Sequence, residues 1–145
     1  MKYKGFWADN NFEGQGTSYH RNSKKDYEGE WSNSKKNGLG KSFFRKHERL
    51  MYDGQWKNNK HHGEGTQHYS NGKIHYKGNW THGKQQGKGV FYDESGVKVY
   101  DANFVDGKLQ GKGILYFSNG IIEYEGEWSN SEYNGLGQEN HADGQ

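Results

Sequence analysis

The stretch Tyr27-Glu28-Gly29-Glu30-Trp31 belongs to a pattern that decides the fold of this 145-residue chain. The pattern Tyr-x-Gly-x-Trp starts six times at a spacing of 24 or 25 residues, at Tyr3, Tyr27, Tyr52, Tyr76, Tyr100 and Tyr124. A Gly-x-Gly pair begins eleven residues after each tyrosine, at Gly14/Gly16, Gly38/Gly40, Gly63/Gly65, Gly87/Gly89, Gly111/Gly113 and Gly135/Gly137. Self-similarity at this period indicates small units that stack on their neighbours. The sequence therefore predicts a single repeat array over residues 1–145.

Each repeat reads as two β-strands. The three named residues of Tyr-x-Gly-x-Trp stand at i, i+2 and i+4, so in a strand they share one face, while the residues between them are mostly polar and face the other way. We expect the rings of one strand to pack over the Gly-x-Gly of its neighbour, because glycine leaves room for a ring on the sheet surface. The aromatic stripe comprises Tyr3, Trp7, Tyr27, Trp31, Tyr52, Trp56, Tyr76, Trp80, Tyr100, Phe104, Tyr124 and Trp128.

Two kinds of connection are expected between the strands. Polar stretches such as residues 57–60 read as hairpin loops inside a repeat. Asn71-Gly72, Ser95-Gly96 and Asn119-Gly120 fall twenty residues after their repeat's tyrosine, and Asn-Gly favours the type I′ turn. The predicted fold class is all-β: an elongated, twisted, single-layer antiparallel sheet of six tandem β-hairpins.

Three repeats depart from the pattern. The second has one extra residue in 45–51 and lacks the turn glycine, so we expect a longer or bulged loop there. The fifth has Ala102 for the glycine and Phe104 for the tryptophan, which predicts a milder version of the same packing. The sixth fills its second strand with polar residues 138–143, as a capping or truncated repeat would.

Composition restricts the function classes. Hydrophobic residues make up 28% of the chain and the mean hydropathy is -1.39, yet 16% is aromatic, so the apolar surface is concentrated in periodic rings. The absence of cysteine excludes disulfides, thiolate nucleophiles and Cys-ligated zinc. No apolar leader or membrane span is visible, so a cytoplasmic protein is expected, with peripheral membrane attachment as a further hypothesis.

The spacing resembles that of the MORN (membrane occupation and recognition nexus) repeat. The resemblance rests on Tyr-x-Gly-x-Trp, the polar loop, Gly-x-Gly and the Asn-Gly turn, and it covers almost the whole chain. It implies a curved, trough-like sheet that acts as a binding or scaffolding module without chemistry of its own. It also implies an unidentified protein partner, with phospholipid binding as an addition.

Two sets of residues are candidate binding sites. The aromatic stripe is interpreted mainly as a thin core, although ring edges in a concave groove would hold a partner's helix or extended peptide. A basic cluster in the second repeat is the hypothetical contact with anionic lipid such as phosphoinositide. It comprises Lys35, Lys36, Lys41, Arg45, Lys46 and Arg49. Nucleic-acid binding is not expected, because rings packed against glycine cannot stack on bases.

No catalytic, cofactor or metal site is predicted. The chain has no nucleophile elbow, HExxH motif or phosphate loop, and its eight histidines are interpreted as solvated. The alternative function is a hairpin solenoid whose aromatic pockets bind glycan or choline groups. The sheet edges would also allow a homodimer. Residues 1–72 carry a net charge of +5 and residues 73–145 a net charge of -3, which is either a steering field or a neutral feature of a solvated surface.

Overall fold

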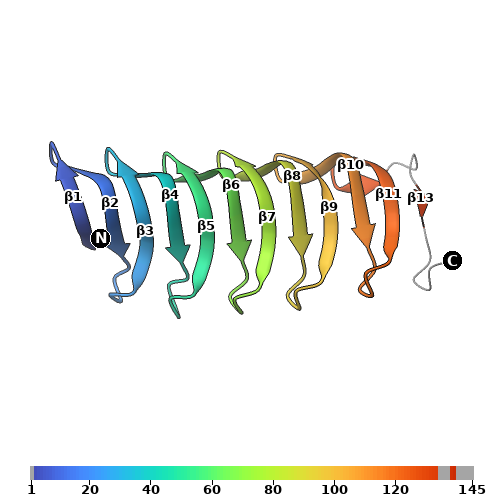
Figure 1. Cartoon of the computed structure of the whole chain (residues 1–145), viewed down its shortest axis with the longest axis horizontal. Coiled ribbons are helices and arrows are strands. Elements are labelled where there is room, and N and C mark those ends of the chain that lie inside the picture. The colour runs from blue at the N-terminus through green and yellow to red at the C-terminus, as the bar shows by residue number, and fades with distance from the viewer. Residues whose placement is uncertain (1, 134–137, 140–145) are drawn as a thin grey trace.

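The computed structural model describes residues 2–133 and 138–139, which form one 13-stranded sheet (Figure 1). The first strands of the six repeats are β1 (Lys2–Ala8), β3 (Lys25–Ser32), β5 (Leu50–Lys57), β7 (Ile74–Thr81), β9 (Lys98–Val105) and β11 (Ile122–Ser129). The second strands are β2 (Asn11–Tyr19), β4 (Lys35–Phe43), β6 (Lys60–His68), β8 (Lys84–Tyr92) and β10 (Lys108–Tyr116). The sixth repeat continues with the short strands β12 (Glu132–Tyr133) and β13 (Gln138–Glu139).

The strands lie side by side in chain order from β1 to β12, and every pairing is antiparallel. Both β12 and β13 pair with β11. The array is elongated, with β1 and β13 at its two ends (Figure 1). The predicted all-β array of hairpin repeats in one open antiparallel sheet is therefore confirmed.

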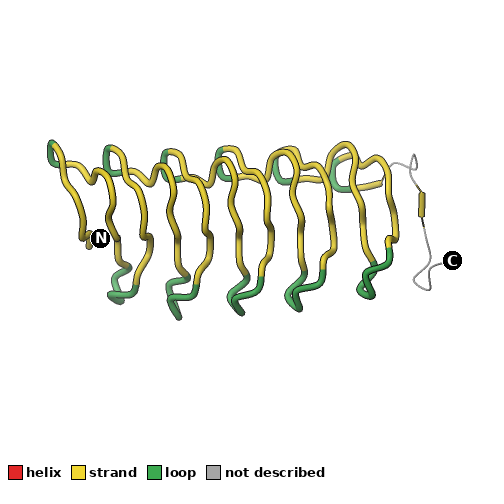
Figure 2. Tube along the Cα trace, in the orientation of Figure 1, coloured by secondary structure: helices red, strands yellow, loops and turns green. Residues whose placement is uncertain are grey.

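The turns at the two long edges differ in kind (Figure 2). Inside each repeat, two residues with positive φ join the strands, as at Asn58 (φ 49°) and Asn59 (φ 69°), which is the signature of a type I′ turn. Between repeats, residues 69–73 form a longer loop in which Gly72 alone has positive φ (90°), and its N–H bonds the Tyr69 carbonyl at 3.0 Å. The type I′ prediction for Asn71-Gly72 was therefore wrong, because a type I turn followed by a left-handed glycine also suits that dipeptide.

The second repeat has the longer loop that its extra residue predicts. Residues 44–49 connect β4 to β5, one residue more than 69–73. Glu48 takes the left-handed conformation (φ 60°) where other loops have glycine, and its N–H bonds the Phe44 carbonyl four residues back at 2.9 Å. The extra residue is thus absorbed by widening the turn, while the strands on both sides keep their register.

Hydrogen bonds between successive turns fasten each repeat to the next. The second residue of each internal turn donates its N–H to a carbonyl of the preceding repeat's second strand, as from Asn59 to Lys36 at 3.0 Å and from Gly83 to His61 at 2.9 Å. At the other edge the Asn71 amide donates to the Glu94 carbonyl at 2.8 Å. Each repeat is consequently held by its neighbour at both edges as well as along the strands.

Candidate functional site

The tyrosine of the repeat pattern lies flat over glycine backbone. Tyr27 is fully buried, and its hydroxyl donates to the Glu30 carbonyl at 2.8 Å. Its ring lies so close to Gly40 that any side chain there would collide with it. Burial raises the pKa of the Tyr27 hydroxyl far above its usual value, with the Glu30 carboxylate adding to the effect. The same burial raises the pKa of Tyr76 to about 12. These hydroxyls are structural hydrogen-bond donors.

The tryptophan of the pattern reaches back to the preceding repeat. The indole N–H donates to a glycine carbonyl at 3.0 Å in Trp31 to Gly16 and in Trp56 to Gly40. Each ring also meets tyrosines edge-on, as Trp56 does with Tyr27 and Tyr52 at 5.2 and 5.0 Å between centroids. The stripe is buried from Trp31 to Trp128, whereas Trp7 at the first strand is 58% exposed.

A third set of residues, which the sequence reasoning missed, covers the tyrosines. The first glycine of each Gly-x-Gly has positive φ, and there the second strand bends so that a side chain near its start lies over the ring. His61 stacks on Tyr52 at 3.7 Å with the ring planes 3° apart, and Phe12 stacks on Tyr3 at 3.9 Å. We call these five equivalent positions the lid residues. They are Phe12, Lys36, His61, Gln85 and Leu109.

The lid residues differ in chemistry although they share one place. Lys36 lies over the rings of Tyr27 and Trp56, with its ammonium 5.3 and 5.2 Å from the two centroids, and pairs with Asp26 at 3.8 Å. Burial lowers the pKa of His61 to about 4, and the positive charge of Lys36 lowers it further. A shared position that accepts Phe, Lys, His, Gln and Leu leaves no repeat motif in the sequence.

Repeat five does not keep a milder version of the packing. In the other repeats the central glycine is needed because a Cβ there would lie close to the tyrosine hydroxyl, 2.8 Å away for Gly29 and Tyr27. Ala102 supplies that Cβ, and Tyr100 is only half-buried and makes no hydroxyl bond to the carbonyl three residues on. The expectation failed because a methyl group excludes the ring from the glycine surface.

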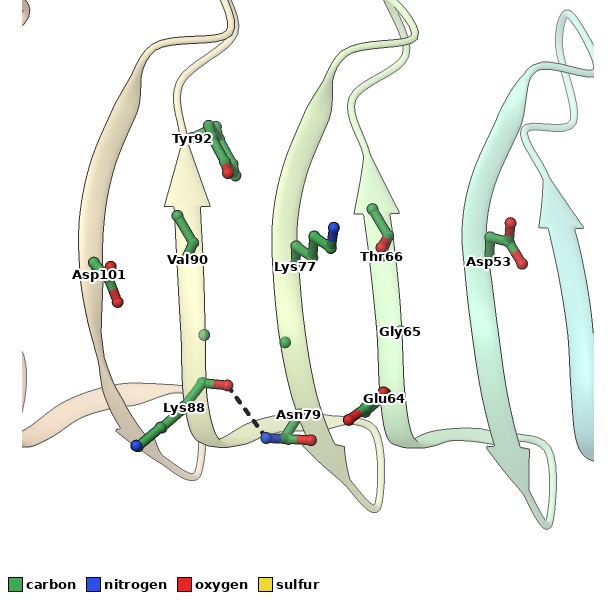
Figure 3. Close-up of a pocket in the computed structure, with 12 residues that line it drawn as sticks. Asp53, Glu64, Gly65, Thr66, Lys77, Asn79, Lys88, Val90, Tyr92 and Asp101 are labelled. Atoms are coloured by element: carbon green, nitrogen blue, oxygen red, sulfur yellow. Dashed lines mark hydrogen bonds between the residues drawn. The ribbon is translucent and has the colours of Figure 1, made fainter.

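The opposite, polar face of the sheet carries a groove. Two adjoining hollows of about 660 and 560 Å³ run across β5–β11 and share Lys88 and Asp101. Their walls are mainly the residues between the named positions of the pattern, together with second-strand residues that face the same way (Figure 3). None of the stripe aromatics lines either hollow. The groove and the aromatic layer are therefore on opposite sides of one sheet.

The groove combines charged and apolar side chains. Five carboxylates and three lysines line it, and none of these eight forms an ion pair with another described residue. Val90, Tyr92 and Ile114 provide apolar surface between them. The charged residues are Asp53, Glu64, Asp101, Glu125, Glu127, Lys77, Lys88 and Lys112. Their alternation with the buried rings was visible in the sequence, but the hollow they form depends on the curvature of the sheet.

The basic cluster of the second repeat is divided among three places. Lys35 and Lys36 start β4, where Lys36 is buried as a lid residue. Lys41 is exposed in the middle of β4, opposite Glu28 and Asp53 on the polar face. The remaining three, Arg45, Lys46 and Arg49, lie in the loop 44–49 at the other edge.

Two searches of the described residues concern the other predicted classes of site. Within residues 2–133 and 138–139 no three His, Asp or Glu side chains gather as a metal site would require. Across the same residues no helix is long and apolar enough to cross a membrane.

The fold and site define a class of protein: a β-hairpin repeat array with a buried aromatic layer on one face and an open groove on the other. A family model for the MORN repeat matches residues 3–23, 27–49, 52–74, 76–98, 100–122 and 124–145. The chain therefore belongs to the MORN repeat family, whose repeat is a non-catalytic type. A search of curated proteins found no significant match.

Proposed function

We propose that this protein is a non-catalytic scaffold that holds a segment of a partner protein in the polar-face groove. The observation that carries the proposal is the row of unpaired charges interspersed with Val90, Tyr92 and Ile114 across two adjoining hollows. Charged side chains of a folded protein gain little from one another when they are not paired, so they are free to bind a ligand. A groove about five strands long suits an extended or helical segment.

The charges of the groove specify the chemistry of the partner segment. Carboxylates outnumber lysines by five to three in the lining, so the segment should carry more basic than acidic side chains. Apolar side chains of the segment would cover Val90 and Ile114. Asp101 borders both hollows and is therefore the residue whose charge matters most.

Site-specific photo-crosslinking in the native cell tests this function. A crosslinking amino acid at Val90 should capture a distinct partner, and the same amino acid at Asn58, in a turn away from the groove, should not. Asp101→Lys should reduce capture at least tenfold. Glu94→Lys makes the same charge change on an exposed loop and should leave capture unchanged. Equal capture at Val90 and Asn58, or equal loss with both charge variants, would contradict the proposal.

A second candidate function, contact with an anionic membrane, is favoured by the loop edge. The loops of repeats one and two lie side by side, since the Asn22 amide donates to the Arg45 carbonyl at 2.9 Å and the Lys24 ammonium donates to the Lys46 carbonyl at 2.5 Å. This brings Arg21 and Lys24 next to the basic residues of loop 44–49. Each basic side chain near an anionic surface contributes about 1 kcal/mol.

Vesicle co-sedimentation tests the membrane function. Vesicles that contain phosphatidylserine should retain the protein, and neutral phosphatidylcholine vesicles should not. Replacing Arg45, Lys46 and Arg49 by Gln should abolish retention, whereas Lys84→Gln on the other edge should have no effect. Equal retention by neutral and anionic vesicles would reject it.

The alternative of aromatic pockets for glycan or choline receives no support from the geometry. The tryptophans of the second, third and fourth repeats are 4–6% exposed, and the tyrosines of those repeats are fully buried beneath lid residues.

A further inference from the structure

The first strand of the sheet exposes aromatic side chains that every later repeat buries. Phe6 is 68% and Trp7 58% exposed, while the tryptophans at the equivalent of Trp7 are 3–6% exposed in later repeats. The cause is positional: in each later repeat the second strand of the preceding repeat covers this edge. β1 therefore presents one half of a repeat-to-repeat interface.

The internal interfaces define what this half accepts. Opposite the tryptophan stands the first glycine of the preceding Gly-x-Gly, as in Gly38↔Trp56, and opposite the central glycine stands the second, as in Gly40↔Gly54. The indole N–H donates to that second glycine's carbonyl at 3.0 Å in Trp56. The acceptable partner is thus an antiparallel strand that contains Gly-x-Gly.

β1 already has the conformation of an internal first strand. The Tyr3 hydroxyl donates to the Phe6 carbonyl at 2.9 Å, as the later tyrosines do three residues on. The Tyr3 ring is stacked on Phe12 and meets Trp7 edge-on at 5.4 Å. Because the acceptor is preorganised, pairing would not have to order it first.

We propose that β1 pairs with the sixth repeat of a second copy of this chain, so that copies associate end to end. The sixth repeat repeats the sequence Gly38-Leu39-Gly40 of β4 as Gly135-Leu136-Gly137. In the internal register Gly135 stands opposite Trp7, Gly137 opposite Gly5, and Leu136 opposite Phe6, so two apolar side chains meet on the polar face.

The described part of the sixth repeat agrees with this register. β13 pairs with β11 as Tyr124↔Glu139, the counterpart of Tyr27↔Ser42 in the second repeat. No described strand covers the other edge of β13. Since β1 and β13 lie at opposite ends of the array (Figure 1), the pairing requires two molecules.

The charge distribution favours head-to-tail over symmetric contact. The half of the chain that contains β1 has a net charge of +5, and the half that contains β13 has -3. Two β1 edges would bring Lys2 and Lys4 of both copies together, whereas opposite ends attract. A head-to-tail contact leaves a free acceptor and a free donor, so association continues into an open series.

Sedimentation velocity over a wide concentration range tests the proposal. The parent chain should form dimers and then larger species. The double variant Phe6→Lys, Trp7→Ala should stay monomeric, and so should Leu136→Lys. An equimolar mixture of these two variants should form dimers and nothing larger, because one competent acceptor and one competent donor remain. Leu39→Lys replaces an equally exposed leucine, 62% exposed on the same face, and should associate like the parent.

The emission of Trp7 provides a readout that leaves β1 unchanged. As the parent chain is concentrated, tryptophan emission should shift to the blue, since Trp7 is the one tryptophan among the described residues that is mostly exposed. The shift should disappear in Leu136→Lys, and thermal unfolding of every variant checks that each is folded. A parent chain that stays monomeric, or a Leu136→Lys variant that still dimerises through two β1 edges, would overturn the proposal.

Discussion

At the scale of single residues, the repeat pattern is a set of steric and hydrogen-bonding requirements. The tyrosine ring needs one glycine beneath it and a second glycine beside its hydroxyl, as Gly40 and Gly29 serve Tyr27. Its hydroxyl and the indole N–H of the tryptophan then satisfy backbone carbonyls that the bend would otherwise leave short of donors. These demands explain why the motif residues recur with so little variation.

Two equivalent serines provide a test of polar burial. Ser18 is fully buried, and its hydroxyl donates to the Asp26 carboxylate at 3.2 Å. Ser42 stands at the same position of the next repeat, is 4% exposed, and has no hydrogen-bond partner among the described residues. Ser18→Ala should therefore lower the free energy of unfolding by about 1 kcal/mol, whereas Ser42→Ala should be neutral or stabilising. Urea unfolding of both variants measures the difference, and equal losses would contradict this assignment.

Histidine 61 should make the stability of the array depend on pH. Burial lowers its pKa to about 4, and the unfolded chain should titrate near its ordinary value of about 6.5. Below the unfolded pKa the unfolded state binds more protons, so the contribution of neutral His61 is complete above about pH 6.5 and is lost as the pH falls towards 4. Because the ring is partly exposed, the expected loss is roughly 2 kcal/mol.

The matched control is His61→Gln, because Gln85 occupies the same lid position in the next repeat. Unfolding free energies of the parent and the variant should converge as the pH falls from about 6.5 to 4. Parallel pH profiles for the two proteins would show that His61 does not remain neutral in the fold.

At the scale of the element, repeat five shows what one methyl group and one lost donor do. Ala102→Gly together with Phe104→Trp restores the pattern of the other repeats. The Tyr100 ring should then cover Gly113, and the new indole should donate to the Gly89 carbonyl, as Trp80 does to Gly65 at 3.2 Å. Two recovered hydrogen bonds, less the backbone cost of glycine, should raise the free energy of unfolding by about 1 kcal/mol.

Thermal and urea unfolding measure that change, with Ala102→Gly alone as the control for the glycine cost. A double variant less stable than the parent would show that the present packing of Tyr100 is the better one.

The sequence predicted the strands and their order because the period of two and the repeat spacing are both visible in it. The turns were harder. Asn-Gly suits two turn types, so residues 69–73 were assigned the type I′ turn that the structure has at Asn58-Asn59 and its equivalents. Local dipeptides do not distinguish a two-residue turn from a longer loop that ends in a left-handed glycine.

The lid residues and the groove could not be predicted for different reasons. The lid position carries a different side chain in each described repeat, and it reaches the tyrosine only because the backbone bends at a positive-φ glycine such as Gly63 (φ 68°). The groove residues were recognised as a polar face, but a flat sheet would leave them as a solvated surface. Curvature, which periodicity does not report, turns that face into a hollow.

At the scale of the whole molecule, the two faces have separate tasks. One face buries the rings that hold neighbouring repeats together, and its side chains are not available to a ligand. The other carries unpaired charges such as Lys88 and Asp101. Because each repeat contacts only its neighbours, damage to one aromatic unit should remain local at first and weaken the array from that point.

Trp80→Ala, followed by amide hydrogen exchange, tests most directly the claim that the aromatic layer holds the array together. Trp80 is 4% exposed, donates to the Gly65 carbonyl and meets Tyr76 edge-on at 5.1 Å, so its truncation should cost about 3–5 kcal/mol. Amide protection should fall first in β5–β9, with β1–β3 protected longer, and Trp7→Ala at the exposed edge should have a much smaller effect. Unchanged protection of β5–β9 in Trp80→Ala would contradict the account.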